Sequence, residues 1–578
     1  MNESTASAAA HARAQGAAGA TGFFRRLLPG YCNAGMLLGA LFVFASLTPS
    51  LIPRAAPEQA ALSGACFAIG YGLGVLLRWL WRYLEVPLPR VARHPRSWQP
   101  VLLLCAVIVV LGLWWGQDWD GVLRKLMGIP PSSAVRILVV GLGALVVGTL
   151  FIVLGRGVWL LLRAGGRMAQ RVLPRRVANV LGVIATGVLL VMLLNGVVIR
   201  SILSGLEASF AARDSLIAPE VMPPTEVDRS GSPASLVRWN ELGRMGRRYI
   251  STGPTAEEIS AFTGKPAMRP LRVYVGLPAA DTPADRAHLA LEELKRIGGF
   301  ERSVLVLITP TGTGWVDPGG IDSIEYLTHG DVASVAAQYS YLNSPLTMFV
   351  DPYTGREMAR ALFREIYGYW HTLPRDKRPK LYLHGLSLGA QNSEWSFEFF
   401  ELMGDPIDGA LWVGPPWTAR YWRAATEARN PGTPAWRPQF GDSSFVRFMN
   451  QQGSGAPHGA AWGPMRIVYL QYASDAITFF NEAWFFREPD WLQPPRGLDV
   501  SAKMRWYPVV TMLQTAMDMP LSMNTPLGFG HAYAPTDYVA AWIEVTGRDD
   551  WTPQQIARLK QHLEERRRAG IESQMPGG

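Results

Sequence analysis

Long apolar runs dominate the first 200 residues of this 578-residue chain. Five of them are long enough to cross a lipid bilayer as helices, and they lie near 33–53, 62–83, 100–117, 135–158 and 178–200. A buried core helix would explain any one run, but it does not explain five in succession. The first run is longer than a signal-peptide core and no clear A-x-A cleavage site follows it, so we interpret it as an anchor. The pattern predicts a transmembrane domain over 31–203, preceded by a disordered cytoplasmic tail at 1–30 that is rich in Ala, Gly and Ser.

Beyond this region the pattern changes to short apolar runs that alternate with amphipathic stretches. Residues 204–268, which include a proline-rich segment at 219–224, are predicted to be a connector. Residues 269–578 form the second domain, in which the alternation predicts a mostly parallel, doubly wound sheet with helices on both faces. Strands are predicted at 271–277, 304–308, 346–350, 381–383, 410–413 and 467–472. Helices are predicted at 283–297, 355–371, 390–402 and 537–545. In such a sheet, ligands bind beyond the carboxyl ends of the strands.

The formal net charge of +9 is unevenly distributed. Residues 1–206 hold 19 Lys and Arg against 5 Asp and Glu, a net charge of +14, and the remaining residues hold 36 against 41, a net charge of −5. Arginines precede the first predicted span and fill the second and fourth loops, so the positive-inside rule places the N-terminus in the cytoplasm. Five spans then place the second domain outside, and an even number would reverse this. The positive charge faces anionic membrane lipid, and the second domain has no basic surface for nucleic acid.

The three cysteines, Cys32, Cys66 and Cys105, lie in or beside the predicted spans. The second domain has none, which excludes a disulfide framework, a thiolate metal site and a cysteine nucleophile there. No metal and no cofactor are expected.

One short motif in the second domain points to nucleophilic catalysis. Gly385-Leu-Ser-Leu-Gly389 fits the G-x-S-x-G nucleophile elbow, in which a strained turn between a strand and a helix exposes the serine oxygen of Ser387. Gly385 and Gly389 are expected because a Cβ at either position would meet neighbouring backbone. The helix that follows would direct its N-terminal amides at a developing oxyanion. The motif alone also fits an ordinary glycine-rich turn, but the flanking strand and helix patterns favour the elbow.

A serine nucleophile in this fold needs an acid and then a histidine further along the chain. Asp475 ends the strand predicted at 467–472, although a solvated loop aspartate or a helix cap also fits its position; Asp518 is the second candidate. His531 lies on a Gly-flanked loop before the final helix, where a structural turn histidine is the alternative. The other histidines are less suitable by position: His11, His94, His288, His329, His371, His384, His458 and His562.

Two backbone amides would form the oxyanion hole. One is that of Leu388, directly after the nucleophile, and the other belongs to the loop Thr311-Gly312-Thr313 after the strand at 304–308, with Gly312 or Thr313 preferred. A phosphate loop is the weaker interpretation of the same residues because the G-K-[ST] ending is missing. Two tryptophan-rich insertions, at 415–463 and 478–524, are predicted to form a cap that supplies an apolar or sugar-stacking wall, and plain core is the alternative.

Seven stretches of the second domain also resemble a known family. They are Arg272-Val-Tyr-Val-Gly-Leu277, Thr311-Gly-Thr-Gly-Trp315, Gln338-Tyr-Ser-Tyr-Leu342, Gly385-Leu-Ser-Leu-Gly-Ala390, Gly414-Pro-Pro416, Tyr469-Leu-Gln471 with Ser474-Asp475, and Gly530-His531. As a set they resemble the bacterial membrane-anchored alpha/beta-hydrolases sometimes called the alpha/beta-hydrolase 9 family. The resemblance implies a multi-span α-helical membrane domain followed by an α/β-hydrolase domain, and a triad of Ser387, Asp475 and His531. One departure is Ala476, where proline is expected after the acid. The family's natural substrates are poorly defined.

Together these features predict a serine hydrolase of the inner membrane, with its active site on the periplasmic side, that acts on carboxylic esters of lipid or envelope origin through an acyl-enzyme. An acyltransferase that passes the acyl group to an envelope glycan or lipid is one alternative. A non-catalytic membrane assembly or binding protein is another, and we expect no proton or cation relay because the interiors of the predicted spans lack acidic residues. Membrane lipid and an ester substrate are the expected partners, and the oligomeric state stays open.

Overall fold

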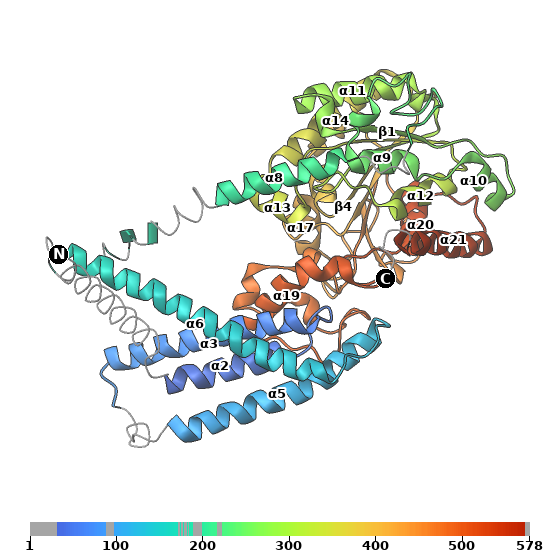
Figure 1. Ribbon diagram of the computed structural model, residues 1–578. Coiled ribbons are helices and arrows are strands. Elements are labelled where there is room, and N and C mark those ends of the chain that lie inside the picture. The colour runs from blue at the N-terminus through green and yellow to red at the C-terminus, as the bar shows by residue number, and fades with distance from the viewer. Residues whose placement is uncertain are drawn as a thin grey trace, which may run out of the picture. The chain divides into compact units, whose positions relative to one another are not determined.

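The computed structural model describes residues 32–87, 98–170, 199–216 and 222–572, with isolated positions between 174 and 188. The predicted tail at 1–30 and most of the predicted span at 178–200 lie outside the described residues. The chain divides into two compact units (Figure 1). The helical unit comprises Met1–Ile202, Trp484–Phe486 and Lys503–Met517, and the sheet unit comprises Leu203–Ala483, Arg487–Ala502 and Asp518–Gly578. The predicted insertion at 478–524 is therefore divided between the two units.

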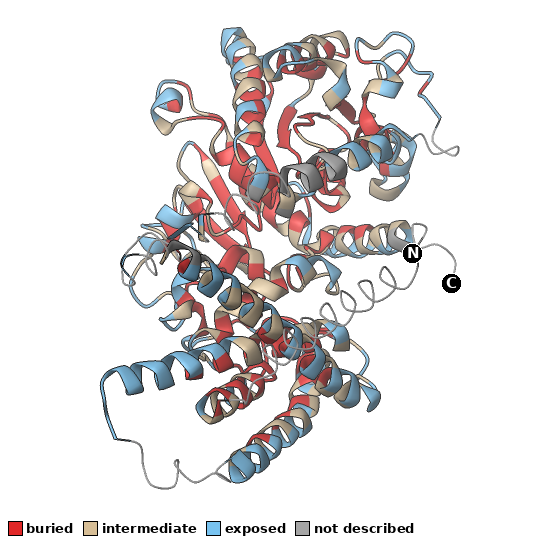
Figure 2. Ribbon diagram, turned by 60° about the vertical axis from the view of Figure 1, so that its left-hand side comes forward, coloured by how far each residue is buried: buried red, intermediate tan, exposed pale blue. Residues whose placement is uncertain are grey.

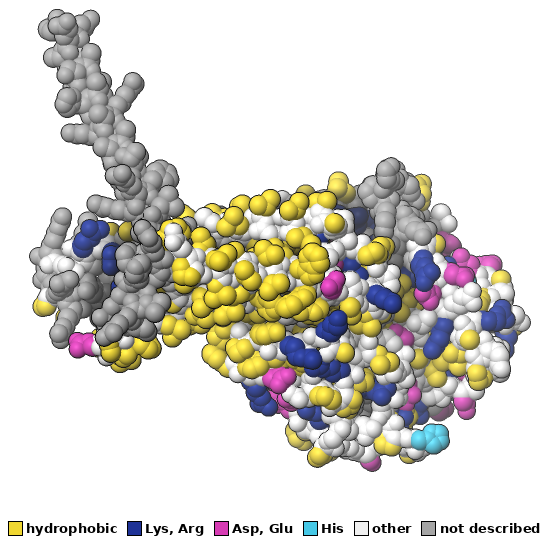
Figure 3. Space-filling model, turned by 90° about the horizontal axis from the view of Figure 1, so that it is seen from below, with side chains coloured by type: hydrophobic (Ala, Val, Ile, Leu, Met, Phe, Trp, Pro, Cys, Tyr) yellow, Lys and Arg dark blue, Asp and Glu magenta, His cyan; other side chains and the backbone are white. Residues whose placement is uncertain are grey.

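Apolar helices make up the N-terminal part of the helical unit. They are α2 (Asn33–Ser46), α3 (Ala56–Tyr83), α5 (Trp98–Leu126) and α6 (Val135–Ala169). Of these, α3, α5 and α6 are long and apolar enough to cross a membrane, whereas α2 is apolar but has only 14 residues. Large apolar side chains such as Leu103 and Trp114 on α5 and Leu142 on α6 are exposed, and Figure 3 shows a broad hydrophobic surface over these helices. Exposed apolar helix surface of this kind is suited to lipid contact.

Facing glycines hold α2 and α3 together. Each helix carries a G-x-x-x-G pattern, Gly35 with Gly39 and Gly70 with Gly74. A Cβ built on Gly74 would lie 2.5 Å from Cα of Gly35, and one on Gly70 would lie 3.0 Å from Cα of Gly39. The two backbones approach too closely for larger residues, which is the packing that small-xxx-small motifs allow between membrane helices.

A buried aspartate corrects one prediction about the spans. Helix α5 does not end near 117 but continues to Leu126, so Asp118 and Asp120 lie within it. The helix is therefore longer than the predicted span, whose interior at 100–117 contains no acidic residue. Asp120 is buried, and its carboxylate forms ion pairs with Arg124 at 2.7 Å and with Arg136 of α6 at 3.2 Å. These pairs neutralise the carboxylate, which is why the helix tolerates it.

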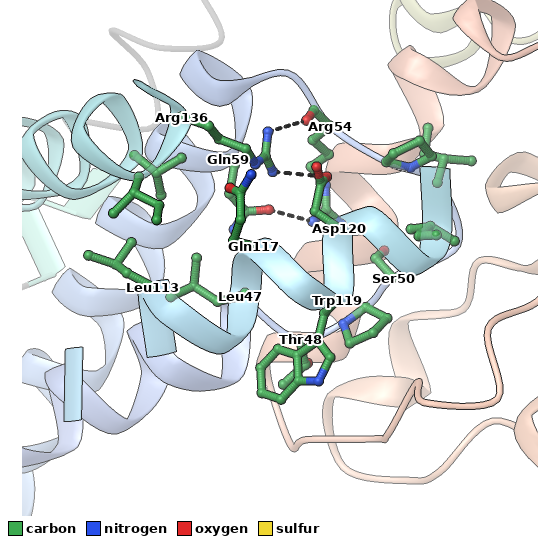
Figure 4. A pocket seen from close by; sticks show the side chains of 17 residues that line it. Leu47, Thr48, Ser50, Arg54, Gln59, Leu113, Gln117, Trp119, Asp120 and Arg136 are labelled. Carbon is green, nitrogen blue, oxygen red and sulfur yellow. Dashed lines mark hydrogen bonds and ion pairs between the residues drawn. The ribbon is translucent and has the colours of Figure 1, made fainter. Parts of the chain in front are cut away.

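The same polar network includes a segment that lies far along the chain. Arg54 donates to the side chain of Gln59 at 3.0 Å and to the main-chain carbonyl of Gln514 at 3.1 Å. Gln514 lies on α19 (Val510–Leu521), and its amide donates to the carbonyl of Thr48 at 3.0 Å. The pocket in Figure 4, about 30 Å³ in volume, lies among Arg54, Gln59, Asp120 and other residues of this network. Since the charged groups of this network have protein partners, the network connects the ends of α3, α5 and α6 with α19.

The sheet unit is built on eight strands in the order β1-β3-β2-β4-β5-β8-β6-β7. They are β1 (Leu271–Val275), β2 (Val304–Thr309), β3 (Val332–Ala337), β4 (Lys380–Leu386), β5 (Gly409–Val413), β6 (Val446–Asn450), β7 (Gly453–Ser454) and β8 (Arg466–Leu470). All neighbours pair parallel except β6 and β7. Figure 2 shows the strands as the buried centre of this unit. The predicted mostly parallel sheet is confirmed, and β1 to β5 and β8 are buried almost throughout, as parallel strands covered on both faces require.

Helices cover both faces of this sheet (Figure 1). The helices from residue 199 onward, apart from α19, are α8 (Ile199–Ser215), α9 (Gly243–Ser251), α10 (Ala256–Thr263), α11 (Pro283–Arg296), α12 (Pro318–Leu327), α13 (Ser344–Val350), α14 (Thr354–Thr372), α15 (Leu388–Glu394), α16 (Phe399–Leu402), α17 (Arg420–Glu427), α18 (Ala476–Phe479), α20 (Pro535–Thr546) and α21 (Pro553–Glu572). Helices α11 and α14 pack together, and α12, α20 and α21 form a second packed group. Tyr382 and His384 of β4 contact Trp542 of α20 and so face this second group.

Two predicted elements are wrong. Residues 346–350 form the end of helix α13 rather than a strand, because the side chain of Asn343 accepts the amide of Leu346 and caps a helix there. The strand in that part of the chain is β3, which was not predicted. The helix predicted at 390–402 is interrupted between α15 and α16, where the hydroxyl of Ser396 takes the Ser393 carbonyl that a continuing helix would use.

The insertion at 415–463, which was predicted to form a cap, also supplies two strands of the sheet. It contains β6, which joins the sheet beside β8, and β7, which pairs with β6. Trp422 and Trp436 from this insertion are buried, and their indole N–H groups donate to Gln471 and to the carbonyl of Pro495. These two tryptophans are therefore part of the core.

Candidate active site

A strained turn joins β4 to α15 at Ser387. This serine has φ 57° and ψ −126°, a conformation that costs a non-glycine residue about 1–3 kcal/mol. A Cβ on Gly385 would lie 2.5 Å from the carbonyl carbon of Gly389, and a Cβ on Gly389 would lie 2.2 Å from the carbonyl oxygen of Thr309. Both positions therefore require glycine because backbone approaches from two sides. The amide of Ser387 donates to the carbonyl of Val413 at 2.8 Å, which fixes the turn at the carboxyl end of the sheet.

The predicted base and acid lie in direct contact. Nδ1 of His531 lies 2.7 Å from Oδ2 of Asp475, and both side chains are buried. Asp475 follows β8 and also caps α18, because its Oδ1 accepts the amide of Ile477 at 2.9 Å. The helix cap at Asp475 is thus confirmed, and its other carboxylate oxygen faces His531. The second candidate, Asp518, lies on α19, where its main-chain carbonyl accepts the hydroxyl of Ser522.

The loop that carries His531 places its imidazole beside the serine turn. The His531 amide donates to the carbonyl of Ser522 at 3.0 Å, and the amide of Gly530 donates to the hydroxyl of Ser474 at 2.9 Å. Cε1 of the imidazole lies 2.7 Å from the position that a Cβ on Gly414 would occupy. Gly414 directly follows Val413, the residue bound to the Ser387 amide. Within the described residues, the buried Nε2 of His531 has no hydrogen-bond partner, and no hydrogen bond joins it to Ser387.

Tyr533 belongs to the same cluster, although the sequence pattern did not single it out. Its hydroxyl donates to Oδ2 of Asp475 at 2.8 Å, the same oxygen that faces His531. Burial raises the pKa of Tyr533 well above its ordinary value, and the negative charge of Asp475 raises it further, so the phenol stays a hydrogen-bond donor. The only sequence signal is its place two residues after the histidine.

The predicted oxyanion loop lies against the elbow, since Gly389 packs on Thr309 at the end of β2. Its conformation is held by the hydroxyl of Tyr274, which donates to the carbonyl of Gly314 at 2.7 Å. Two of the candidate amides are already used: Thr311 donates to the carbonyl of Trp315 and Gly312 to the hydroxyl of Ser344. The amides of Leu388 and Thr313 have no acceptor within the described part of the chain.

Comparison with family models agrees with this arrangement. A model described as the alpha/beta-hydrolase family matches residues 271–559, half of the chain, and one described as the alpha/beta-hydrolase family N-terminus matches 47–254. The chain belongs to the alpha/beta-hydrolase family. The inferred resemblance to alpha/beta-hydrolases is thus confirmed, and the first match spans Ser387, Asp475 and His531. Comparisons with curated proteins and with solved structures gave no match.

Some predicted cap aromatics of this alpha/beta-hydrolase lie near the elbow helix. Trp417 is half-buried and contacts Phe480 edge to face, with ring centres 4.7 Å apart. The next residue, Thr418, donates to the side chain of Gln391 on α15 at 3.0 Å. Trp417 thus directly precedes a residue that is bonded to the elbow helix, and the amide of Trp422 donates to Glu394 of the same helix at 3.2 Å.

A second buried histidine of the hydrolase fold lies on β4 but has a different environment. Nδ1 of His384 lies 2.9 Å from the carbonyl oxygen of Leu411, and burial lowers the pKa of His384 to about 4. The imidazole is therefore neutral at physiological pH and packs against α20. Among the described residues, no group of His, Cys, Asp and Glu side chains has the arrangement of a metal site.

Proposed function

We propose that this alpha/beta-hydrolase is a membrane-anchored serine hydrolase that cleaves carboxylic esters through an acyl-enzyme on Ser387. The observation that carries the proposal is the hydrogen bond between His531 and Asp475, which leaves Nε2 of the buried imidazole unpartnered beside a strained serine turn. A base held in this way needs only the serine hydroxyl to complete a proton-transfer line.

Each residue of the proposed triad has a defined task. Oγ of Ser387 attacks the ester carbonyl while Nε2 of His531 takes its proton, and Asp475 holds the proton on Nδ1 and stabilises the imidazolium that forms. Collapse of the tetrahedral intermediate expels the alcohol, which receives that proton from Nε2. Water then attacks the acyl-enzyme with His531 as base, and the acid product leaves.

A hydrogen bond between Ser387 and His531 must form before this chemistry. None joins them within the described residues, and such bonds often tighten only when substrate binds. Ser387 is 7% exposed and His531 is 2% exposed, so an entering acyl group would displace the little water that reaches them.

The amides of Leu388 and Thr313 are proposed to bind the oxyanion. They are the two predicted donors without a protein acceptor among the described residues, whereas Thr311 and Gly312 serve to shape the loop. One such donor contributes about 10²–10³-fold to kcat in acyl transfer.

Transfer of the acyl group to an alcohol of an envelope glycan or lipid is the second candidate reaction. The low exposure of Ser387 favours it, because an acyl-enzyme shielded from water can persist until an acceptor arrives. A pre-steady-state burst whose slow phase accelerates only when glycan or lipid is added would favour this reaction over hydrolysis.

The proposed location is the inner membrane, with the sheet unit on the periplasmic side. It rests on the arginine-rich loops and on three helices of sufficient length. Protease added to spheroplasts should then degrade the sheet unit, and complete protection of that unit would place it in the cytoplasm.

Ester hydrolysis by the full chain in detergent tests the catalytic proposal. With p-nitrophenyl esters of increasing chain length, Ser387→Ala should lose at least 10³-fold in kcat. The matched control is Ser393→Ala, which removes the same hydroxyl near the end of α15, where it accepts only the indole of Trp412 within the described residues. The control should keep activity within about threefold of the wild type. Equal activity of Ser387→Ala and the wild type would overturn the proposal.

A further inference from the structure

A second cavity in the sheet unit lies among α9, α12, α20 and α21. Its volume is about 210 Å³, and it is lined by Arg248 of α9, by Gly319 and Asp322 of α12, by Pro535 of α20 and by Arg566 and Arg567 of α21. It lies at the N-terminal ends of α12 and α20, where both helices leave the carboxyl edge of the sheet. The walls of this cavity thus combine three guanidinium groups with two helix N-termini.

Arg248 is an arginine without a partner. Within the described residues its guanidinium makes no hydrogen bond and no ion pair, although the side chain is half-buried. Burial lowers the pKa of Arg248, and the positive charges of Arg567 and Arg244 lower it further, while Asp317 opposes them. Arginine stays protonated after shifts of this kind. Arg248 therefore places a positive charge in the wall of the cavity without a carboxylate bonded to it.

Arg567 is only weakly compensated. Its closest carboxylate is Oδ1 of Asp317 at 3.6 Å, too long for a hydrogen bond, and its buried Nε has no hydrogen-bond partner among the described residues. The Asp317 carboxylate is already occupied, because it accepts the amide of Gly319 at 3.0 Å and the hydroxyl of Tyr538 at 3.0 Å. Arg567 therefore retains hydrogen-bonding capacity for another acceptor.

Arg566 differs, since it has partners that hold it in place. It donates to the carbonyl of Thr252 at 3.0 Å and lies 3.4 Å from both Asp322 and Glu258. Asp322, the one carboxylate in the lining, is shared with Arg272 at 2.8 Å. The arginines of the lining thus have Asp317, Asp322 and Glu258 as neighbouring carboxylates, and Arg248 and Arg567 are the two that keep unused N–H groups.

We infer that this cavity binds a phosphate group. The oxygens of a phosphate would accept the unused N–H groups of Arg248 and Arg567, with the planar geometry that guanidinium offers to phosphate. A volume of about 210 Å³ holds the phosphate together with part of the molecule that carries it. The site is separate from the proposed triad and does not depend on it.

Calorimetric titration of the full chain in detergent tests this inference, with chloride keeping the ionic strength constant. The probes are inorganic phosphate and a short-chain phosphatidylglycerol below its critical micelle concentration. Binding of inorganic phosphate identifies a free phosphate or phosphomonoester as the ligand, and binding of the phospholipid alone identifies a lipid headgroup. Either result supports the site, and failure of both probes to bind at millimolar concentration overturns it.

Variants that each remove one positive charge test whether phosphate binds in this cavity. Arg248→Gln and Arg567→Gln should each weaken the affinity at least tenfold. The control is Arg568→Gln on the same helix, because this 68% exposed side chain pairs with Glu564 and does not line the cavity. It removes the same charge and should change the affinity less than twofold. Equal weakening by all three variants would mean non-specific attraction and would overturn the proposal. Fluorophosphonate labelling at Ser387 checks that each variant is folded without depending on phosphate.

Discussion

Replacing Gly389 by alanine tests whether the close contact between elbow and oxyanion loop sets the catalytic geometry. The new methyl carbon would lie 2.2 Å from the carbonyl oxygen of Thr309, whereas ordinary contact begins at 3.4 Å. Because the obstacle is backbone, one of the two segments must move by about 1.2 Å, and overpacking of this kind costs about 1–3 kcal/mol. A displacement of about 1 Å between nucleophile and oxyanion donors lowers the rate by about 10²-fold.

The assay measures kcat/KM for ester hydrolysis and the thermal midpoint of the same preparations. Gly389→Ala should lose about 10²-fold in kcat/KM and also lose stability. The matched control is Gly368→Ala in the middle of α14, where the new methyl group meets nothing within 4 Å. This control should be neutral or more stable by about 0.5–1 kcal/mol because alanine favours helix. Wild-type activity of Gly389→Ala would refute the reasoning.

Three further changes have defined outcomes. Tyr533→Phe removes a hydrogen bond to Oδ2 of Asp475, and because a bond to a charged group contributes about 1.5–3 kcal/mol, the variant should lose stability by about that amount; an unchanged thermal midpoint would exclude this role. Asp120→Asn leaves its two arginine partners without their counter-charge and should destabilise the protein by about 3 kcal/mol, whereas an unchanged thermal midpoint in detergent would contradict a structural network. The pKa of His384 is lowered to about 4 in the folded protein. Between pH 4 and about 6.5 this imidazole is therefore protonated in the unfolded chain but neutral in the folded protein. The stability of the wild type relative to His384→Gln should therefore fall by up to about 3 kcal/mol as pH drops from 7 to 4, and parallel denaturant-unfolding curves would contradict this.

Local sequence patterns indicated the turn at Ser387 and the contact between the predicted acid and base. Gly385 and Gly389 report a local steric constraint, so their spacing around Ser387 indicated the turn that the structure contains. Asp475 and His531 were chosen by chain order and strand ends, and the structure brings them into contact. Tyr533 was missed because its role depends on the course of a loop, which no local pattern encodes.

Long-range features were also missed. The strand β3 is rich in alanine, and its burial follows from its place between β1 and β2 rather than from a strongly apolar pattern. Asp120 was expected in a loop because a charged residue usually ends an apolar run, but two arginines neutralise it within α5. The assignment of Lys503–Met517 to the helical unit depends on contacts such as that of Gln514 with Thr48, which lie far apart in the sequence.

Mapping the residue that reacts with a fluorophosphonate tests the central claim most directly. The full chain is labelled in membranes, digested and analysed by tandem mass spectrometry, with Ser387→Ala and Ser393→Ala treated in parallel. The account predicts a single adduct on Ser387 that is lost in the first variant and kept in the second. An adduct on another serine, or equal labelling of Ser387→Ala, would show that this turn is not the nucleophile.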